Sequence, residues 1–166
     1  MSLNNPLWQT ALRLYAVPGV EQAALELQRA GCSINRMLLA CYLAQQGRRL
    51  VPALLIGEAL EWQQALTHPL RELRYRVRAR KAENEELEPC YRAFRQAELA
   101  CEQVELMLLW DALSALELPT AEAGEPLARR NLEQVLVASG VSDPGRFDAE
   151  LSLLIGATLA DPLASG

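Results

Sequence analysis

Hydrophobic residues recur every three or four positions along most of the chain, the spacing of one face of an α-helix. Turn-forming residues divide this pattern: Asn5 and Pro6 can start a helix, Gly31 can end one, and Ser33 can cap the next. Residues 37–43 are apolar or weakly polar on every side, which predicts a helix buried in the middle of the core. The helices predicted for this part of the chain cover about 6–16, 19–30 and 34–46.

Two longer apolar stripes predict a helical hairpin. After Pro52 the apolar positions step by three or four, and after Leu87 they step alternately by three and four. A polar turn between the stripes would let them face each other in antiparallel order. His68 and Pro69 interrupt the first stripe, so we expect a kink or a break there. The hairpin is predicted over about 52–82 and 87–118.

The last part of the chain predicts two shorter helices, one between Pro126 and Gly140 and one over about 146–156. The tail, residues 157–166, is expected to fray. Composition supports helices throughout, because the chain has 32 Leu and 25 Ala but few β-branched or aromatic residues. We therefore predict an all-α fold, a single-domain helical bundle of about six or seven helices that spans 1–166.

The charge is unevenly distributed along the chain. The formal net charge is -5, but residues 1–82 carry 11 basic and 5 acidic side chains, whereas 83–166 carry 5 basic and 16 acidic ones. The overall acidity argues against a dedicated nucleic-acid coat, and a hydrophobic content of 51% excludes a disordered chain.

The cysteines and the apolar runs bear on localisation. The four cysteines lack CxxC spacing and no secretory leader is recognisable, so we expect free thiols in a reducing compartment, by default the cytoplasm. Every long apolar run is interrupted by Arg, Glu or Gln, which argues against a membrane-spanning helix and for a soluble protein. Among the thiols, Cys32 at a helix junction is expected to be the most exposed, and Cys90 and Cys101 to pack in the core.

A basic run on one helical face is the strongest polar feature. It could bind an acidic protein partner or phosphate groups. Alternatively, the hairpin would place Glu98 and Glu102 opposite Arg71, so that the charges pair within the chain. A nucleic-acid groove would also need aromatic residues between the cations, and only Tyr75 is available. The candidate partner-binding residues are Arg71, Arg74, Arg78 and Lys81.

Motifs for catalysis and cofactor binding are missing from the sequence. It contains no glycine-rich nucleotide motif, and the single histidine, His68, has no GxSxG nucleophile to serve. Glu98, Glu102 and Glu105 share a helical face, but a di-iron bundle would also need Glu-x-x-His pairs, which are absent. We therefore expect no catalytic residue, no metal site and no cofactor.

The corner around Gly31 allows two further interpretations. Two helices joined by a short turn are typical of a DNA-binding helix-turn-helix, but the apolar centre of the second helix favours burial instead. Gln28 and Asn35 flank the corner and are expected to satisfy backbone groups at the helix ends. The weaker alternative is a pocket for a small apolar ligand, lined by Trp8, Tyr15, Gln28 and Asn35.

Short segments of the chain resemble a known family. The residues that carry the resemblance are Asn5-Pro6-Leu7-Trp8, Leu14-Tyr15-Ala16, Pro18-Gly19-Val20, Leu27-Gln28, Ile34-Asn35, Tyr42-Leu43-Ala44, Gly47, Trp62, Pro69-Leu70 and the Arg-rich stretch that follows. They are similar to a proteobacterial family of small all-helical proteins of unknown function, over about residues 5–110. The resemblance implies a bacterial cytosolic helical domain and supplies no catalytic residues.

These observations favour a non-catalytic protein-protein interaction or regulatory module with an unknown protein partner. One alternative is a nucleic-acid-associated regulator that uses the basic face from Arg71 to Lys81. A weaker alternative is a small apolar ligand binder or an enzyme. A homo-oligomer is also possible, because the helix that follows Leu87 is longer than such a domain needs.

Overall fold

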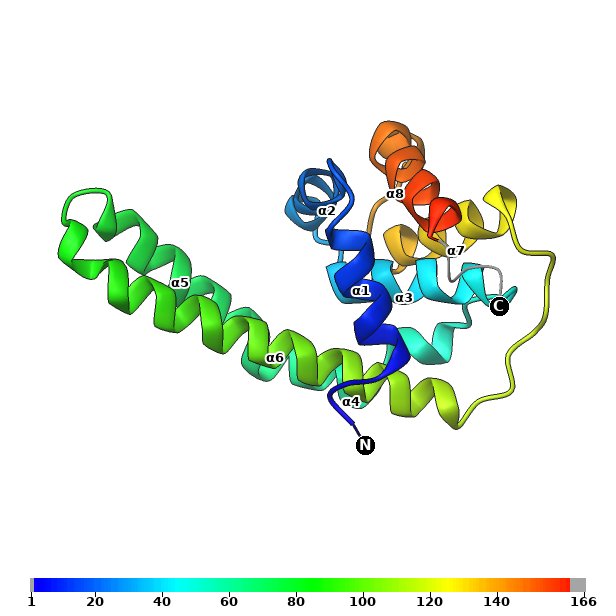
Figure 1. Ribbon diagram of the computed structural model, residues 1–166, viewed down its shortest axis with the longest axis horizontal. Coiled ribbons are helices and arrows are strands. Elements are labelled where there is room, and N and C mark those ends of the chain that lie inside the picture. The colour runs from blue at the N-terminus through cyan, green and yellow to red at the C-terminus, as the bar shows by residue number, and fades with distance from the viewer. Residues whose placement is uncertain (1, 162–166) are drawn as a thin grey trace.

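The computed structural model describes residues 2–161, and every regular element within them is helical (Figure 1). The prediction of an all-α fold is therefore confirmed. In chain order the helices are α1 (Pro6–Tyr15), α2 (Val20–Arg29), α3 (Ile34–Gln45), α4 (Glu58–Trp62), α5 (His68–Lys81), α6 (Glu88–Ser114), α7 (Glu125–Ala138) and α8 (Asp148–Ala160). Short 3-10 turns at Pro52–Leu55, Glu85–Leu87 and Pro144–Phe147 and a π turn at Gln63–Thr67 complete the elements.

Side-chain caps determine where the first helices begin. The Asn5 side chain accepts a hydrogen bond from the Trp8 backbone N–H at 2.9 Å, and Pro6 occupies the first turn, where no donor is needed. Ser33 Oγ caps α3 by accepting from the Arg36 N–H at 3.4 Å. Ten of the twelve residues of α3 are buried, so the predicted central helix is confirmed.

Helices α1, α2, α7 and α8 surround α3 and form a globular body (Figure 1). Helix α7 makes the most extensive contact with α3. Asn131 of α7 is fully buried, where it accepts from the Leu50 N–H and donates to the Arg48 carbonyl, both at 3.0 Å. These bonds connect α7 to the segment that follows α3 and satisfy backbone groups that no helix serves.

Helices α5 and α6 form a hairpin that projects from the body (green in Figure 1). We call α5 and the part of α6 that pairs with it, residues 68–104, the arm. Among the described residues, the buried hydrophobic core has no member between Ala59 and Leu106. This follows from geometry, because two helices packed side by side cannot enclose a core without a third layer.

The hairpin differs in detail from its prediction over 52–82 and 87–118. Pro52–Leu55 is a separate 3-10 turn, and α6 ends at Ser114. No break occurs at His68 and Pro69, because α4, the π turn and α5 follow one another without interruption. The wider π turn directly before Pro69 accommodates the proline ring and its missing N–H, which would disrupt an ordinary α-helical turn.

The C-terminal helix is longer than predicted. α8 extends to Ala160, so residues 157–160 of the tail expected to fray are helical, whereas 162–166 lie outside the described residues. Within the described part of the chain, none of the helices combines the length and the apolar character needed to cross a membrane.

Candidate functional site: a basic cleft between body and arm

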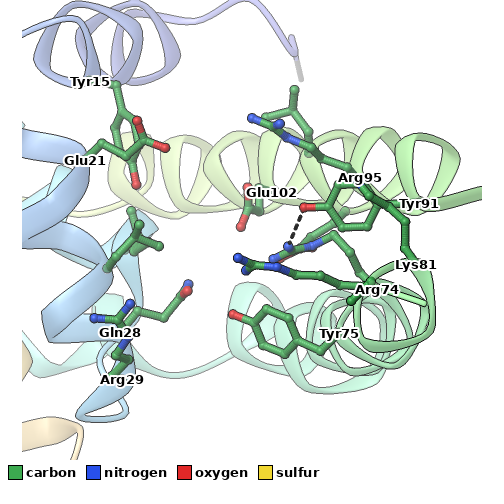
Figure 2. Close-up of a pocket in the computed structure, with 16 residues that line it drawn as sticks. Tyr15, Glu21, Gln28, Arg29, Arg74, Tyr75, Lys81, Tyr91, Arg95 and Glu102 are labelled. Carbon is green, nitrogen blue, oxygen red and sulfur yellow. Dashed lines mark hydrogen bonds and ion pairs between the residues drawn. The ribbon is translucent and has the colours of Figure 1, made fainter. Parts of the chain in front are cut away.

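An open cleft of about 870 Å³ lies between α2 and the arm. Figure 2 shows its two walls, with Tyr15, Glu21, Gln28 and Arg29 on the side of the body and the arm residues opposite. The polar and aromatic side chains that the arm contributes are Arg74, Tyr75, Arg78, Lys81, Tyr91, Arg95, Glu98 and Glu102.

Ion pairs across the hairpin form the floor of the cleft. Arg71 donates to Glu98 at 2.7 Å and to Glu102 at 2.9 Å, and Arg74 also binds Glu98. Burial lowers the pKa of Arg71, but its bonds to the two carboxylates outweigh this effect and raise the pKa overall. Two of the four predicted partner-binding residues therefore pair within the chain, as the alternative based on the hairpin anticipated.

The other two predicted residues differ from each other. Lys81 pairs with Glu88 and lies 4.8 Å from the centre of the Tyr91 ring. Arg78 is exposed in the cleft, and its side chain has no hydrogen bond or ion pair with any described residue. Arg95 of α6, which was not among the predicted residues, is likewise exposed in the cleft, and its side chain has no hydrogen bond or ion pair with a described residue. Among the cations that the arm contributes to the cleft, Arg78 and Arg95 are therefore the two that no described carboxylate binds.

Tyrosine rings lie beside the cations of the arm. The Arg74 guanidinium stacks 4.7 Å from the centre of the Tyr75 ring and donates to the Tyr91 hydroxyl at 3.5 Å (Figure 2). On the opposite wall, burial and the nearby Glu102 charge raise the pKa of Tyr15. The Tyr15 hydroxyl therefore stays protonated at neutral pH and can donate a hydrogen bond.

The four residues predicted to line an apolar pocket do not lie together. Tyr15 and Gln28 line the cleft, whereas Trp8 packs against the hydrophobic core. Asn35 is buried and donates to the Glu102 carbonyl at 3.2 Å. When the Gln28 amide is oriented with its oxygen toward Arg71, that oxygen accepts a hydrogen bond from Arg71 Nη1 at 3.1 Å. Gln28 and Asn35 thus contact α5 and α6 instead of capping α2 and α3.

The thiols also differ from their prediction. Cys32 is buried, with 3% of its surface exposed, whereas Cys90 is exposed. The reason is that Cys32 packs into the core of the body, while Cys90 lies near the tip of the arm, where no third helix covers it. A DNA-reading role for α3 is likewise excluded by its burial.

The lining of the cleft consists of charged, aromatic, amide and apolar side chains. None of the described residues that line it is Ser, Thr, Cys, His or Asp, and no group of three or more metal-binding side chains occurs in the described part of the chain.

The sequence signal for Arg95 and Tyr91 is a polar stripe on α6. Positions 91, 95, 98 and 102 step by four, three and four beside the apolar stripe.

A second, smaller hollow of about 590 Å³ lies near the C-terminal end of α6. Tyr42 and Trp110 meet there edge to face, with ring centres 5.8 Å apart. Arg48, at the rim, donates to the Leu118 carbonyl at 3.1 Å.

These features define a class of all-helical proteins in which a helical body and a projecting arm enclose a basic, tyrosine-rich cleft. The model of a family of proteins of unknown function, DUF2390, matches residues 6–109, and the chain belongs to this family. The match includes both walls of the cleft and the whole arm, but not α7 or α8. Comparison with curated proteins and with solved structures found no match.

Proposed function

We propose that the protein is a non-catalytic interaction or regulatory module of the bacterial cytoplasm, which binds an acidic segment of a partner protein in the cleft. The observation that carries this proposal is the position of Arg78 and Arg95. Both guanidinium groups face the open cleft, and neither has an ion-pair partner among the described residues. The four free cysteines are compatible with a reducing compartment.

The charge and shape of the cleft favour a carboxylate-bearing partner. Five cationic and three acidic side chains line it, and two of the acids, Glu98 and Glu102, are already bound by arginines. The remaining positive charge can attract an acidic segment, and a guanidinium group can bind a carboxylate through two hydrogen bonds. Exposed tyrosine faces such as Tyr75 add apolar contact area beside these charges.

Nucleic acid is the less favoured partner. Arg71 and Arg74, which would supply half of the basic face, are bound by carboxylates. The acidic side chains on the floor and on α2 would repel a phosphate backbone. The cleft is also open and partly polar, which disfavours a small apolar ligand.

The proposal can be tested with a short amphipathic peptide helix that carries glutamates along one face, labelled for fluorescence anisotropy. The double variant Arg78→Glu/Arg95→Glu should bind it about tenfold more weakly or worse, because two attractive charge pairs become repulsive. The matched control is Arg76→Glu/Arg80→Glu, which makes the same charge change at exposed positions of α5 outside the cleft. This control should bind almost as well as the unaltered protein.

Equal losses in both double variants would show non-specific attraction and overturn the cleft as the binding site. Stronger, steeply salt-dependent binding of a single-stranded oligonucleotide would favour the nucleic-acid alternative.

Sedimentation of the protein alone tests the expected self-association. A dimer abolished by Arg78→Glu/Arg95→Glu would identify a second copy as the occupant, in place of another protein.

A further inference from the structure

A cluster of buried polar side chains joins the arm to the body. Ser33 and Arg36 come from the start of α3, Gln63 and Thr67 from the π turn, and Glu105 from α6. We call these five residues the root cluster. Arg36 is 6% exposed and Glu105 is 1% exposed, although charged side chains are rarely buried to this extent without a direct partner.

Gln63 connects the two charges of the root cluster. Its Oε1 accepts from Arg36 Nη1 at 2.9 Å, and its Nε2 donates to Glu105 Oε1 at 3.0 Å and to Ser33 Oγ at 2.8 Å. Arg36 and Glu105 themselves form no ion pair in the described structure. One amide in a π turn therefore links α3, α6 and the helix that leads into α5.

The root cluster contains most of the unmatched polar atoms of the described residues. Six buried side-chain nitrogen or oxygen atoms lack a hydrogen-bond partner, and four of them belong to this cluster: Arg36 Nε and Nη2, Thr67 Oγ1 and Glu105 Oε2. Unmatched buried groups are costly, so a looser packing in which the same atoms reach water would recover part of this cost.

The charge on Glu105 changes this balance. Burial raises its pKa to about 7, against the opposing effects of the polar Asn35 and Ser33 side chains and the positive charge of Arg36. The neighbouring Glu102 carboxylate raises it further. The closely packed root therefore favours the neutral carboxyl, and a root in which water reaches Glu105 favours the carboxylate.

Two other titratable groups, His68 and Tyr15, lie near the root. The pKa of His68 is lowered by burial and by the charges of Arg71 and Arg36. Tyr15 interacts with Glu102 across the cleft. Since His68 is the only histidine, it is the group to control for in a pH experiment near neutrality.

We infer that loss of the proton from Glu105 loosens the root of the arm, so that the cleft between α2 and the arm opens as the pH rises through neutrality. The geometry supports this because one wall of the cleft belongs to the body and the other to the arm, and the root cluster connects the two. By linkage, a proton that binds the closed form more tightly shifts the equilibrium toward it. If the proposed function holds, an acidic partner would be bound at lower pH and released at higher pH.

The test measures the distance between body and arm and needs no partner. Spin labels at Gln22→Cys on α2 and Glu83→Cys at the arm tip would be added to a Cys90→Ser/Cys101→Ser background, in which the remaining thiols are buried. Pulsed electron paramagnetic resonance should show a longer, broader distribution of distances between the two labels at about pH 8 than at about pH 6. Glu105→Gln, which cannot ionise, should give the closed distribution at both values.

Two further variants keep the inference falsifiable. His68→Gln should leave the pH response unchanged. Arg36→Met removes a charge that favours the carboxylate, so the midpoint of the transition should move to higher pH. A distribution independent of pH, or a response that persists in Glu105→Gln, would overturn the inference. Arm motion and peptide binding are measured in separate experiments. A failed peptide experiment therefore does not contradict the arm motion, and a failed distance experiment does not contradict peptide binding.

Discussion

Two carboxylates two helical turns apart on α6 have opposite surroundings. Glu98 is bound by Arg71 and Arg74, which compensate its charge directly. Glu105 receives only neutral donors, Gln63 and Ser33, and keeps one oxygen without a partner among the described residues. The two carboxylates therefore differ in how directly an arginine compensates a negative charge at their position.

The effect of Glu105 on stability has a definite sign. Its pKa is raised from 4.5 to about 7, so the folded protein binds the proton more tightly than the unfolded chain does. Stability from this group is fully present below about pH 4.5 and is lost as the pH rises to about 7, which amounts to roughly 3 kcal/mol in the free energy of unfolding. Glu105→Gln should remove this fall and be more stable than the unaltered protein at about pH 8.

Urea unfolding at several pH values measures this difference. Glu72→Gln, at an exposed position of α5, serves as the control and should keep the pH dependence of the unaltered protein. A Glu105→Gln variant with an unchanged dependence would show that another group is responsible.

For individual residues, the ion pairs of the hairpin were predicted better from the sequence than the burial of the cysteines. The pairing of Arg71 with Glu98 and Glu102 followed from the antiparallel hairpin and its register. The burial of Cys32 and the exposure of Cys90 did not, because periodicity shows which face of a helix is apolar but not whether another helix covers it. The Gln63 bridge depends on a π turn, which has no clear sequence signal.

Among the elements, the connection after α3 is constrained by one glycine. Gly47 has a φ of +60°, and a Cβ built there would lie 2.9 Å from the Ala121 carbonyl oxygen. The same segments form a backbone bond, from the Ala121 N–H to the Gly47 carbonyl at 2.9 Å. Both the left-handed conformation and the close approach require glycine.

Gly47→Ala should therefore lower the free energy of unfolding by more than about 2 kcal/mol, the sum of left-handed strain and a backbone clash. The matched control is Gly140→Ala, at the C-terminal end of α7, where φ is +87° but no atom lies within 4 Å of the added Cβ. That variant should lose only about 1 kcal/mol. Chemical denaturation of both compares them, and equal losses would mean that the contact with Ala121 contributes nothing.

Helix starts were predicted closely and helix continuity was not. Asn5 and Ser33 act as caps because their side chains satisfy free backbone N–H groups, a rule that depends only on local sequence. A kink or a break was expected at His68 and Pro69, but the helix continues through the proline by way of a π turn. That choice depends on Gln63 contacts with α3 and α6, which are distant in sequence.

For the whole molecule, the separation of core and arm predicts tolerance to a large deletion. Replacing residues 78–91 with a short glycine-containing turn removes the outer arm and keeps the bonds of Arg71 and Arg74 to Glu98. Since no buried core residue is lost among those described, the free energy of unfolding should change by less than about 1 kcal/mol. Circular dichroism during thermal unfolding checks this, and loss of a cooperative transition would contradict it.

The sequence predicted an all-helical chain with a hairpin, but not that the hairpin would leave the body. Apolar stripes such as the one that follows Leu87 are equally compatible with a hairpin packed onto a bundle and with a free one. The cleft exists because the arm diverges from α2, so its location could not be predicted before the arm was placed. Of the cations and tyrosines that line it, the sequence singled out Arg74, Arg78, Lys81, Tyr15 and Tyr75, but not Arg95 or Tyr91.

The arm also acts as a mechanical lever. From Glu105 at its root to Glu88 at its outer end, α6 spans about 26 Å at the rise of an α-helix. A rotation of about 10° at the root would therefore displace the outer end by about 4 to 5 Å, which exceeds the length of a hydrogen bond. A change too small to disturb the core could thus separate the contacts in the outer part of the cleft.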